Sequence, residues 1–413
     1  MNTATHTPAA SSSDTGNSRF GAFGSGKDVR RVEDDLLLKG AGQFTDDVVA
    51  PDLGDLYFLR SPYAHAGIRS INADAAKAMP GVRLVVTGAD LVQAGVNPIP
   101  GVSGFARADG SPARSAPRYA LAVGRVRFVG EPVAAVVAQT LEQARQAAEA
   151  IEVDYDSLPV AVHLADATAP GAPLMCEELG DNIAAEMRHG DAKATAAAFA
   201  AAKHVVRLNI ANQRLSALAL EPRSVLHTYD AESGRLTIRM SSQMPSGLRD
   251  TVCGALNLPK AQCRVIVGDV GGGFGMKTGA YPEDVAVAFC CRALKRPVKW
   301  IADRSEEFLS AGHGRDVDSV AELALDANGK ILALRVVSEA NIGAYATGVA
   351  VAIALLIGPW VQTSVYDIQT IDFHFKGVLT NTAPIGAYRG AGRPEAIYVI
   401  ERLMDEAARQ TGI

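Results

Sequence analysis

Apolar and polar residues alternate in a way that defines two organised regions of the chain. In the first, between about residues 40 and 160, short apolar runs predict strands that alternate with short helices. The strand-like runs are Leu56–Arg60, Arg83–Thr87, Pro132–Ala138 and Ile151–Tyr155. Thr140 and Gln143 have the spacing of a capping box and predict a helix between the last two strands. The face that this helix is expected to bury consists of Leu141, Ala144, Ala148 and Ile151.

The second region is longer and mixes helical and strand patterns. It follows a linker at 161–203, in which Pro170 and Gly171 interrupt the pattern before an alanine-rich helix at 191–202. The region ends in a predicted helix at 395–410 with an apolar face that needs a partner. That face consists of Ile397, Ile400, Leu403, Met404 and Ala407. The chain exceeds one ordinary core, so the expected organisation is α+β with parts at 1–26, 27–160, 161–203 and 204–413.

The segment 341–366 contains no charged side chain and is long enough to suggest a membrane span. Gly343, Gly348, Gly358 and Pro359 interrupt it, and the aromatic and basic flanks typical of a span are missing. We therefore expect a buried segment inside a large domain, and no membrane span.

Composition and charge narrow the class of protein. The net charge is −5, and no basic stripe is present, which argues against a nucleic-acid partner. The first 26 residues are rich in Ser, Thr, Ala and Gly but lack the apolar core of a signal peptide, so they predict a disordered tail. The expected protein is a soluble cytoplasmic enzyme component.

The cysteines and histidines show no spacing typical of a metal site. The five cysteines form no CxxC pair, so no iron–sulfur cluster or structural zinc is expected within this chain, and they are interpreted as buried thiols. No directly protein-ligated metal is expected, since the eight histidines lack HExxH spacing. His65 has no nucleophile beside it and is interpreted as a turn residue that holds backbone groups.

The most informative motif is the glycine-rich run from Gly271 to Lys277, which follows a strand-like run at 264–267. Its consecutive backbone N–H groups suit an anionic cofactor. A P-loop is excluded because Met276 separates Gly275 from Lys277, and the dinucleotide spacing GxGxxG is also absent. The alternative is a tight turn that needs positive φ and has no chemical role.

Two other segments favour the cofactor-binding interpretation. They are Ser241-Ser242-Gln243-Met244 and the run Gly386-Ala387-Tyr388-Arg389-Gly390-Ala391-Gly392-Arg393-Pro394-Glu395. Together with the glycine run, they resemble the molybdopterin-binding large subunit of the xanthine oxidase family of molybdenum hydroxylases. The resemblance implies an α/β hammerhead domain over 27–160, carried by the stretches 59–66 and 130–134, followed by the first part of a large α+β molybdopterin-binding domain.

The resemblance also assigns roles to single residues. It implies Gln243 as the glutamine near the metal's apical oxygen, and Arg389 as an active-site arginine that stabilises developing negative charge. The cofactor-binding residues that it implies are Gln243, Gly271, Gly272, Gly273, Phe274, Gly275 and Arg389. Upstream, Glu221 and Arg223 are interpreted as a structural ion pair, with support of the cofactor as the alternative.

Three departures from the family pattern narrow the activity. The carbon monoxide dehydrogenases of the family carry a copper-binding cysteine after the loop arginine, where this chain has Gly390, so CO oxidation is disfavoured. Purine-oxidising members carry a phenylalanine where this chain has Ala391, and a glutamate where it has Thr278. Xanthine is therefore not the default substrate.

The resemblance covers only part of a family large subunit. The chain is expected to be its N-terminal portion or a naturally split half, without the second cofactor-binding region and the catalytic glutamate. The expected function is hydroxylation of an aldehyde or N-heterocycle with water. The expected cofactor is molybdenum–molybdopterin, with the cytosine dinucleotide form as one option. Expected partners are an iron–sulfur subunit with a 2Fe–2S cluster, an FAD subunit and, if the subunit is split, a complementary C-terminal half. The alternative is a noncatalytic cofactor-binding or assembly module.

Overall fold

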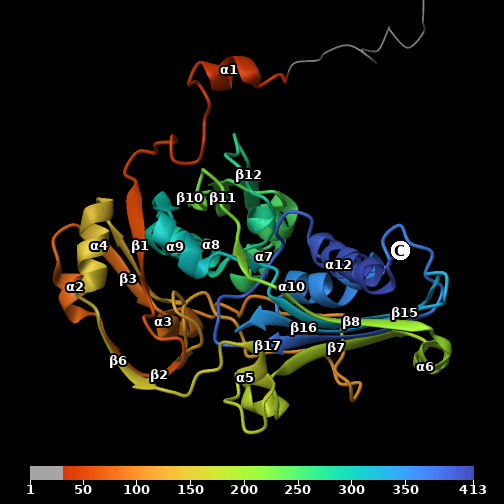
Figure 1. Ribbon diagram of the computed structural model, residues 1–413. Helices are drawn as coiled ribbons and strands as arrows, with labels where there is room; N and C mark the ends of the chain where they lie inside the picture. The colour runs from red at the N-terminus through yellow and green to blue at the C-terminus, as the bar shows by residue number, and fades with distance from the viewer. Residues whose placement is uncertain (1–30) are drawn as a thin grey trace, which may run out of the picture. The chain divides into compact units, whose positions relative to one another are not determined.

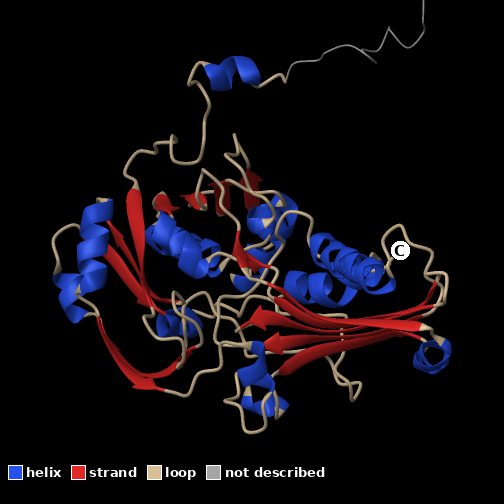
Figure 2. Ribbon diagram, in the orientation of Figure 1, coloured by secondary structure: helices blue, strands red, loops and turns tan. Residues whose placement is uncertain are grey.

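The computed structural model describes residues 31–413, so the tail expected at 1–26 lies outside the described residues. The chain divides into two units. The first ends at Gln43 and contains the short helix α1 (Asp34–Leu38). The second comprises Phe44–Ile413 and combines helices with mixed sheets, as Figures 1 and 2 show. This combination confirms the α+β class.

The largest sheet draws strands from both regions defined by the sequence pattern. In spatial order it consists of β12 (Cys263–Ile266), β11 (Arg235–Met240), β10 (Ser224–Asp230), β13 (Val298–Ile301), β1 (Gly54–Arg60), β5 (Pro132–Ala138) and β3 (Val82–Thr87). The two sets of strands meet where β1 pairs in parallel with β13, with Gly54 opposite Val298. Backbone hydrogen bonds therefore join the N-terminal strands directly to those of the second region.

Strand β5 is buried along its whole length because helices cover both faces of the sheet. Helix α4 (Leu141–Glu149) packs on one face and α8 (Pro282–Leu294) on the other. Thr140 caps α4 by accepting a hydrogen bond from the Gln143 N–H, as predicted, but the reciprocal bond of a capping box is not formed, because Gln143 Oε1 has no partner. The expected apolar face of this helix is wrong at Leu141, which is 50% exposed, whereas Ala144, Ala148 and Ile151 are buried.

A five-stranded sheet forms the second core. Its order is β7 (Ile183–Gly190), β17 (Ile371–Leu379), β16 (Ile331–Gly343), β15 (Val317–Leu325) and β8 (His204–Asn212). Helix α12 (Arg393–Thr411) lies on this sheet against β8 and β15 (Figure 1). The expectation of an unpartnered face on this helix is therefore wrong: Ile400, Leu403 and Ala407 are buried in the sheet's own core, and Ile397 stays exposed.

The uncharged segment 341–366 is mostly internal structure of this core. It contains the end of β16, helix α10 (Gly348–Ala352), a π-helical turn (Ile353–Ile357) and α11 (Gly358–Trp360). Trp360 and Val365 are exposed, while Val351 and Leu355 are fully buried. No helix within residues 31–413 is long and apolar enough to cross a membrane.

The remaining elements are short. The predicted linker contains α5 (Leu164–Thr168) and β7, and its alanine-rich helix is α6 (Ala192–Ala201), capped by Asp191. A three-stranded sheet consists of β4 (Arg125–Val126), β2 (Ala66–Asn72) and β6 (Glu152–Ser157), and a two-stranded sheet of β14 (His313–Gly314) and β9 (Leu215–Ser216). The other helices are α2 (Asp74–Ala78), α3 (Gly88–Gln93), α7 (Pro245–Ala255) and α9 (Arg304–Ser310).

His227, in the middle of β10, makes the fold sensitive to acid. Its side chain is fully buried, neither ring nitrogen has a partner, and burial lowers its pKa to about 3. As the pH falls below about 6.5, His227 is therefore protonated in the unfolded chain but stays neutral in the folded protein. The free energy of unfolding decreases as a result. We expect His227→Phe to recover about 2 kcal/mol of this loss between pH 7.5 and pH 5, measured by urea unfolding.

The quantity to compare between variant and wild type is the change in the free energy of unfolding with pH. Burial raises the pKa of Asp284 to about 7, so that carboxyl changes stability in the opposite direction over the same pH range. An exposed histidine provides the matched control, and His189→Phe should leave the pH dependence unchanged. Equal pH dependence of wild type and His227→Phe would show that His227 does not carry the effect.

Candidate functional site

The sheet topology brings Gln243 to the glycine loop. Strands β11 and β12 are parallel neighbours, so the segments that follow them leave the sheet at the same edge. Gln243 lies in the segment after β11, and the loop Gly271–Gly275 lies in the segment after β12. The Gly275 N–H donates a hydrogen bond of 2.9 Å to Gln243 Oε1. This bond fixes the orientation of the amide and leaves its NH₂ group free to donate elsewhere.

The arginine loop at 386–393 joins the same place from a distant part of the sequence. The Arg389 N–H donates a 2.9 Å hydrogen bond to the Phe274 carbonyl, and the Arg389 guanidinium lies 6.0 Å from the centre of the Phe274 ring. The two loops approach so closely that a Cβ atom on Gly275 would lie 2.4 Å from the Ala387 carbonyl oxygen. The three predicted motifs therefore meet in one site.

The backbone of the glycine loop is held in an unusual conformation. Gly272 and Gly275 have φ of 99° and 95°, and between them Phe274 has φ of 50° although it carries a side chain. A Cβ atom on Gly273 would lie 2.6 Å from Gln243 Oε1, so only glycine allows Gln243 to approach. Positive φ at a residue such as Phe274 persists only where the surroundings hold it, and such strain is typical of ligand sites.

The loop offers donors and charge that the described protein does not use. The N–H groups of Gly272, Gly273 and Phe274 donate to no acceptor within residues 31–413. Arg389 is exposed, and its guanidinium forms no ion pair with any residue in that range. Unpaired N–H groups beside an unpaired cation fit an anionic group with hydrogen-bond acceptors. The site therefore fits the expected type of cofactor.

A buried lysine and a glutamate anchor the loop from behind. Glu221 Oε2 accepts hydrogen bonds from the Gly271 N–H at 2.8 Å, from the Ser241 hydroxyl at 2.6 Å and from Lys277 Nζ at 3.0 Å. Lys277 also donates to the Ser241 hydroxyl and the Glu221 carbonyl, both at 2.8 Å. It is 3% exposed, and burial lowers the pKa of its amine. One carboxylate thus joins the segments that carry Gln243 and the glycines.

Lys277 was not among the predicted site residues. The residues beside Lys277 give no signal of its role, because its partner Glu221 lies 56 residues away in the sequence. The expected ion pair between Glu221 and Arg223 is not formed: Glu221 pairs with Lys277, whereas Arg223 pairs with Glu283 and Glu307. Glu221 instead holds the Gly271 N–H and Lys277, and its support of a cofactor stays a prediction.

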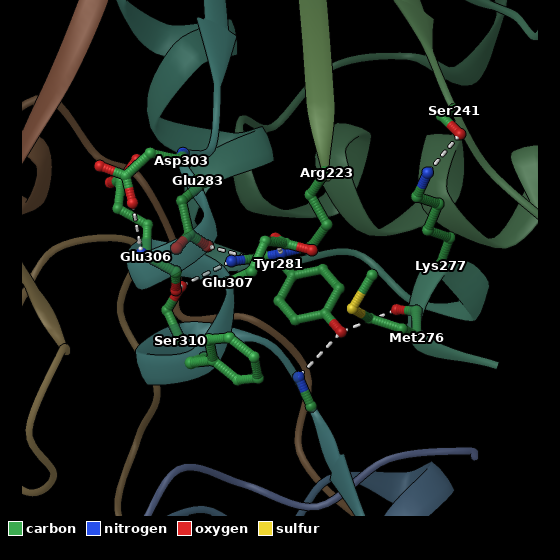
Figure 3. A network of polar contacts seen from close by, with 12 residues as sticks. Arg223, Ser241, Met276, Lys277, Tyr281, Glu283, Asp303, Glu306, Glu307 and Ser310 are labelled. Carbon is green, nitrogen blue, oxygen red and sulfur yellow. Dashed lines mark hydrogen bonds and ion pairs between the residues drawn. The ribbon is translucent and has the colours of Figure 1, made fainter. Parts of the chain in front are cut away.

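Arg223 belongs to a buried polar network beneath the glycine loop, shown in Figure 3. Its guanidinium donates to Glu307 at 2.7 Å and to the Ser310 hydroxyl at 2.6 Å, and it stacks 4.1 Å from the centre of the Tyr281 ring. Burial alone would raise the pKa of Glu283, but Arg223 and Arg60 lower it to about 2.

Tyr281 connects this network to Met276, directly after the glycine loop, and to Gly312. The Tyr281 hydroxyl donates to the Met276 carbonyl at 2.7 Å and accepts from the Gly312 N–H at 3.0 Å (Figure 3). The arginine loop is held by Arg315, which donates to the Tyr388 and Arg389 carbonyls at 3.1 and 2.8 Å. Tyr281 and Arg315 also fall outside the predicted site residues, and their contacts depend on segments far apart in the sequence.

The structure also shows the surroundings of His65 and the cysteines, which were interpreted as residues without a chemical role. His65 donates from Nδ1 to the Pro159 carbonyl at 2.7 Å, which confirms its interpretation as a turn residue. The five cysteines are free and buried, as expected. The part of the chain that the structure describes contains no group of three or more His, Cys, Asp or Glu side chains that could hold a metal ion.

Known proteins share both the fold and this site region. The profile of the molybdopterin cofactor-binding domain matches residues 175–413, and that of the aldehyde oxidase and xanthine dehydrogenase a/b hammerhead domain matches residues 39–159. The crystal structure of quinoline 2-oxidoreductase from Pseudomonas putida 86 superposes with a TM-score of 0.85. It shares 36% sequence identity over 93% of this chain and 48% of that chain.

The extent of the match differs between two of the relatives. The carbon monoxide dehydrogenase large chain of Hydrogenophaga pseudoflava is 35% identical over 393 residues, which cover 92% of this chain and 47% of that protein. The nicotinate dehydrogenase large molybdopterin subunit of Eubacterium barkeri is 30% identical over 396 residues, which cover 94% and 86%. The chain thus spans about half of the first relative and most of the second. It belongs to the xanthine dehydrogenase and aldehyde oxidase family, in which an α/β hammerhead domain accompanies a molybdopterin cofactor-binding domain.

Proposed function

We propose that this chain forms part of the active site of a molybdenum hydroxylase that oxidises an aldehyde or an N-heterocycle. The observation that supports this most strongly is the meeting of Gln243, the loop Gly271–Gly275 and Arg389 around unused N–H donors and an unpaired cation. When bound, a molybdenum–molybdopterin cofactor supplies the redox chemistry that transfers oxygen derived from water to carbon. The cytosine dinucleotide form of the cofactor remains one option.

Each residue then has a role that its geometry allows. Gln243 keeps its amide oxygen on the Gly275 N–H and directs its NH₂ group to an oxygen of the bound group. The N–H groups of Gly272, Gly273 and Phe274 donate to the anionic cofactor. Arg389, placed by the Phe274 carbonyl and supported through Arg315, stabilises negative charge that develops on the substrate.

Part of the site and its partners lie beyond these residues. We propose that the remaining cofactor contacts, and the general-base glutamate that the family resemblance implies, come from residues outside these 413, on the same polypeptide or on another. Electrons leave through an iron–sulfur subunit and then an FAD subunit. We further propose a cytoplasmic location, with which the five free cysteines are consistent.

An isotope experiment tests the proposed reaction. The complex purified from its native host should convert an aromatic aldehyde to the acid and incorporate ¹⁸O from labelled water in a single turnover. Incorporation from labelled O₂ instead would contradict the proposal. A complex that contains the cofactor but turns over none of a panel of aldehydes and N-heterocycles would favour the alternative, a noncatalytic cofactor-binding or assembly module.

Gly390 argues against CO oxidation. Its φ of 95° is unfavourable for a side chain, and a Cβ atom there would lie 2.6 Å from Pro394 Cγ. The chain thus offers no thiolate at this position and no room for one without a backbone shift. We expect the purified complex to contain no stoichiometric copper and to show no CO-dependent dye reduction. Stoichiometric copper found by elemental analysis, together with CO-dependent dye reduction, would contradict this prediction.

A further inference from the structure

A cavity lies directly beside the candidate site. It has a volume of about 80 Å³, and Gly275 and Ala387, from the two loops of the site, form part of its wall. A second cavity of about 820 Å³ is lined largely by residues 97–102 and 113–118. The two cavities share five lining residues, which are Arg118, Gly279, Ala280, Thr347 and Val349. They therefore adjoin each other, and Arg118 lies where they meet.

Arg118 is a half-buried cation whose side chain has no hydrogen-bond or ion-pair partner among the described residues. Its Nε–H is buried and has no acceptor, and its guanidinium forms no hydrogen bond or ion pair with any residue in the described range 31–413. The Arg118 guanidinium lies 5.7 Å from the centre of the Tyr345 ring. By contrast, buried Arg60 and Arg223 each pair with two carboxylates. A buried N–H donor without an acceptor is costly, and the positive charge of the guanidinium favours an anion as the missing acceptor.

The acidic groups nearest to Arg118 are committed elsewhere. Glu131 accepts hydrogen bonds from the Tyr345 hydroxyl and from the Arg127 N–H, and Glu283 is held between Arg60 and Arg223. The other polar groups of the smaller cavity are also occupied. The Thr278 hydroxyl donates to the Gly275 carbonyl, and the Tyr281 hydroxyl to the Met276 carbonyl.

Much of the remaining wall of the smaller cavity is apolar. Its wall includes Ala280, Val349, Pro384 and Ile385. Such a wall accommodates a planar hydrocarbon or heteroaromatic body, while the guanidinium can hold a carboxylate through two parallel hydrogen bonds.

We propose that Arg118 binds the carboxylate of an aromatic or heteroaromatic substrate whose body fills the smaller cavity toward Gly275 and Ala387. This inference rests on the proposed function, because it names a substrate class for that same site. Arg118 is then a specificity-determining residue. It distinguishes carboxylate-bearing substrates from neutral ones of the same shape, and takes no part in the bond-making step.

The test uses the holoenzyme complex and a matched substrate pair, 4-formylbenzoate and its neutral analogue 4-formylbenzamide. In the wild type, kcat/KM should favour the carboxylate. Arg118→Met should lower kcat/KM for 4-formylbenzoate by about 10–100-fold, the size of a lost charge-assisted hydrogen bond, and leave 4-formylbenzamide nearly unchanged. Arg118→Lys should restore part of the preference. The control is Arg114→Met: Arg114 lines the larger cavity but donates to the Glu178 carbonyl, so its loss should not change the preference.

Calorimetric binding of benzoate separates this inference from the proposed function. Benzoate binding should weaken by a similar factor in Arg118→Met but not in Arg114→Met, and this result would support the Arg118 site. If the wild type oxidised neither aldehyde, that finding would count against the proposed function and not against the Arg118 site. Equal loss of kcat/KM for both aldehydes, or benzoate binding that does not depend on Arg118, would overturn the inference.

Discussion

Replacing Gln243 with alanine should lower the turnover of the holoenzyme by about 10²-fold, as the loss of one oriented donor does at a charge-stabilising site. The Gly275 N–H holds the Gln243 amide by its oxygen, so the NH₂ group is the part that remains available to the bound group. Because Gln243 is exposed in the described chain, the fold should survive the change. Steady-state kinetics should be compared at equal molybdenum content.

Two further variants make this result specific. Gln243→Glu retains an acceptor for the Gly275 N–H but has no NH₂ donor, so it should lose as much turnover as the alanine variant. Gln146, on the exposed surface of α4, bonds to Glu142 one turn away, and Gln146→Ala should have no effect. Wild-type turnover by Gln243→Ala at normal cofactor content would disprove the role assigned to Gln243.

Replacing Lys277 with methionine should destabilise the protein by about 3–5 kcal/mol, as the breaking of a buried ion pair does. The side chains of Lys277 and Glu221 are 1% and 12% exposed, so the variant leaves a carboxylate without its cation in a place that water hardly reaches. That carboxylate also holds the Gly271 N–H and the Ser241 hydroxyl. We therefore expect lower cofactor content as well as a lower urea midpoint.

The double variant Lys277→Met with Glu221→Gln checks this explanation. Removing both charges leaves no unpaired carboxylate, so its loss of stability should be clearly smaller than the sum of the two single losses. Additive losses would mean that the pair does not act as a unit. Lys260→Met is a matched control, because Lys260 pairs with Asp250 on the surface and its loss should cost less than about 1 kcal/mol.

The strands of the first region could be predicted from local pattern, because the apolar residues within each strand determine its burial. β5 matches the predicted run Pro132–Ala138, and β3 begins one residue before the predicted run Arg83–Thr87. The motifs around Gln243 and the glycine run could also be found, since the residue types themselves carry the chemistry. Their roles stay predictions until variants are measured.

Pairings between distant segments could not be predicted in the same way. Helix α12 shows this: its apolar face was found, but its partner is a sheet whose strands come from as far back as residue 183, so the face looked unpartnered. Lys277 and Arg118 illustrate the same limit for single residues. Nothing in their immediate neighbourhood says whether a cation is solvated, paired with a carboxylate, or left free beside a cavity.

The molybdenum and pterin content of the protein purified from its native host, with its associated subunits, tests the central claim most directly. We predict about one molybdenum and one molybdopterin for each copy of this chain, with a lower content in Lys277→Met. A pure complex that lacks both, from cells in which another molybdopterin enzyme is fully loaded, would contradict the claim that these loops bind the cofactor.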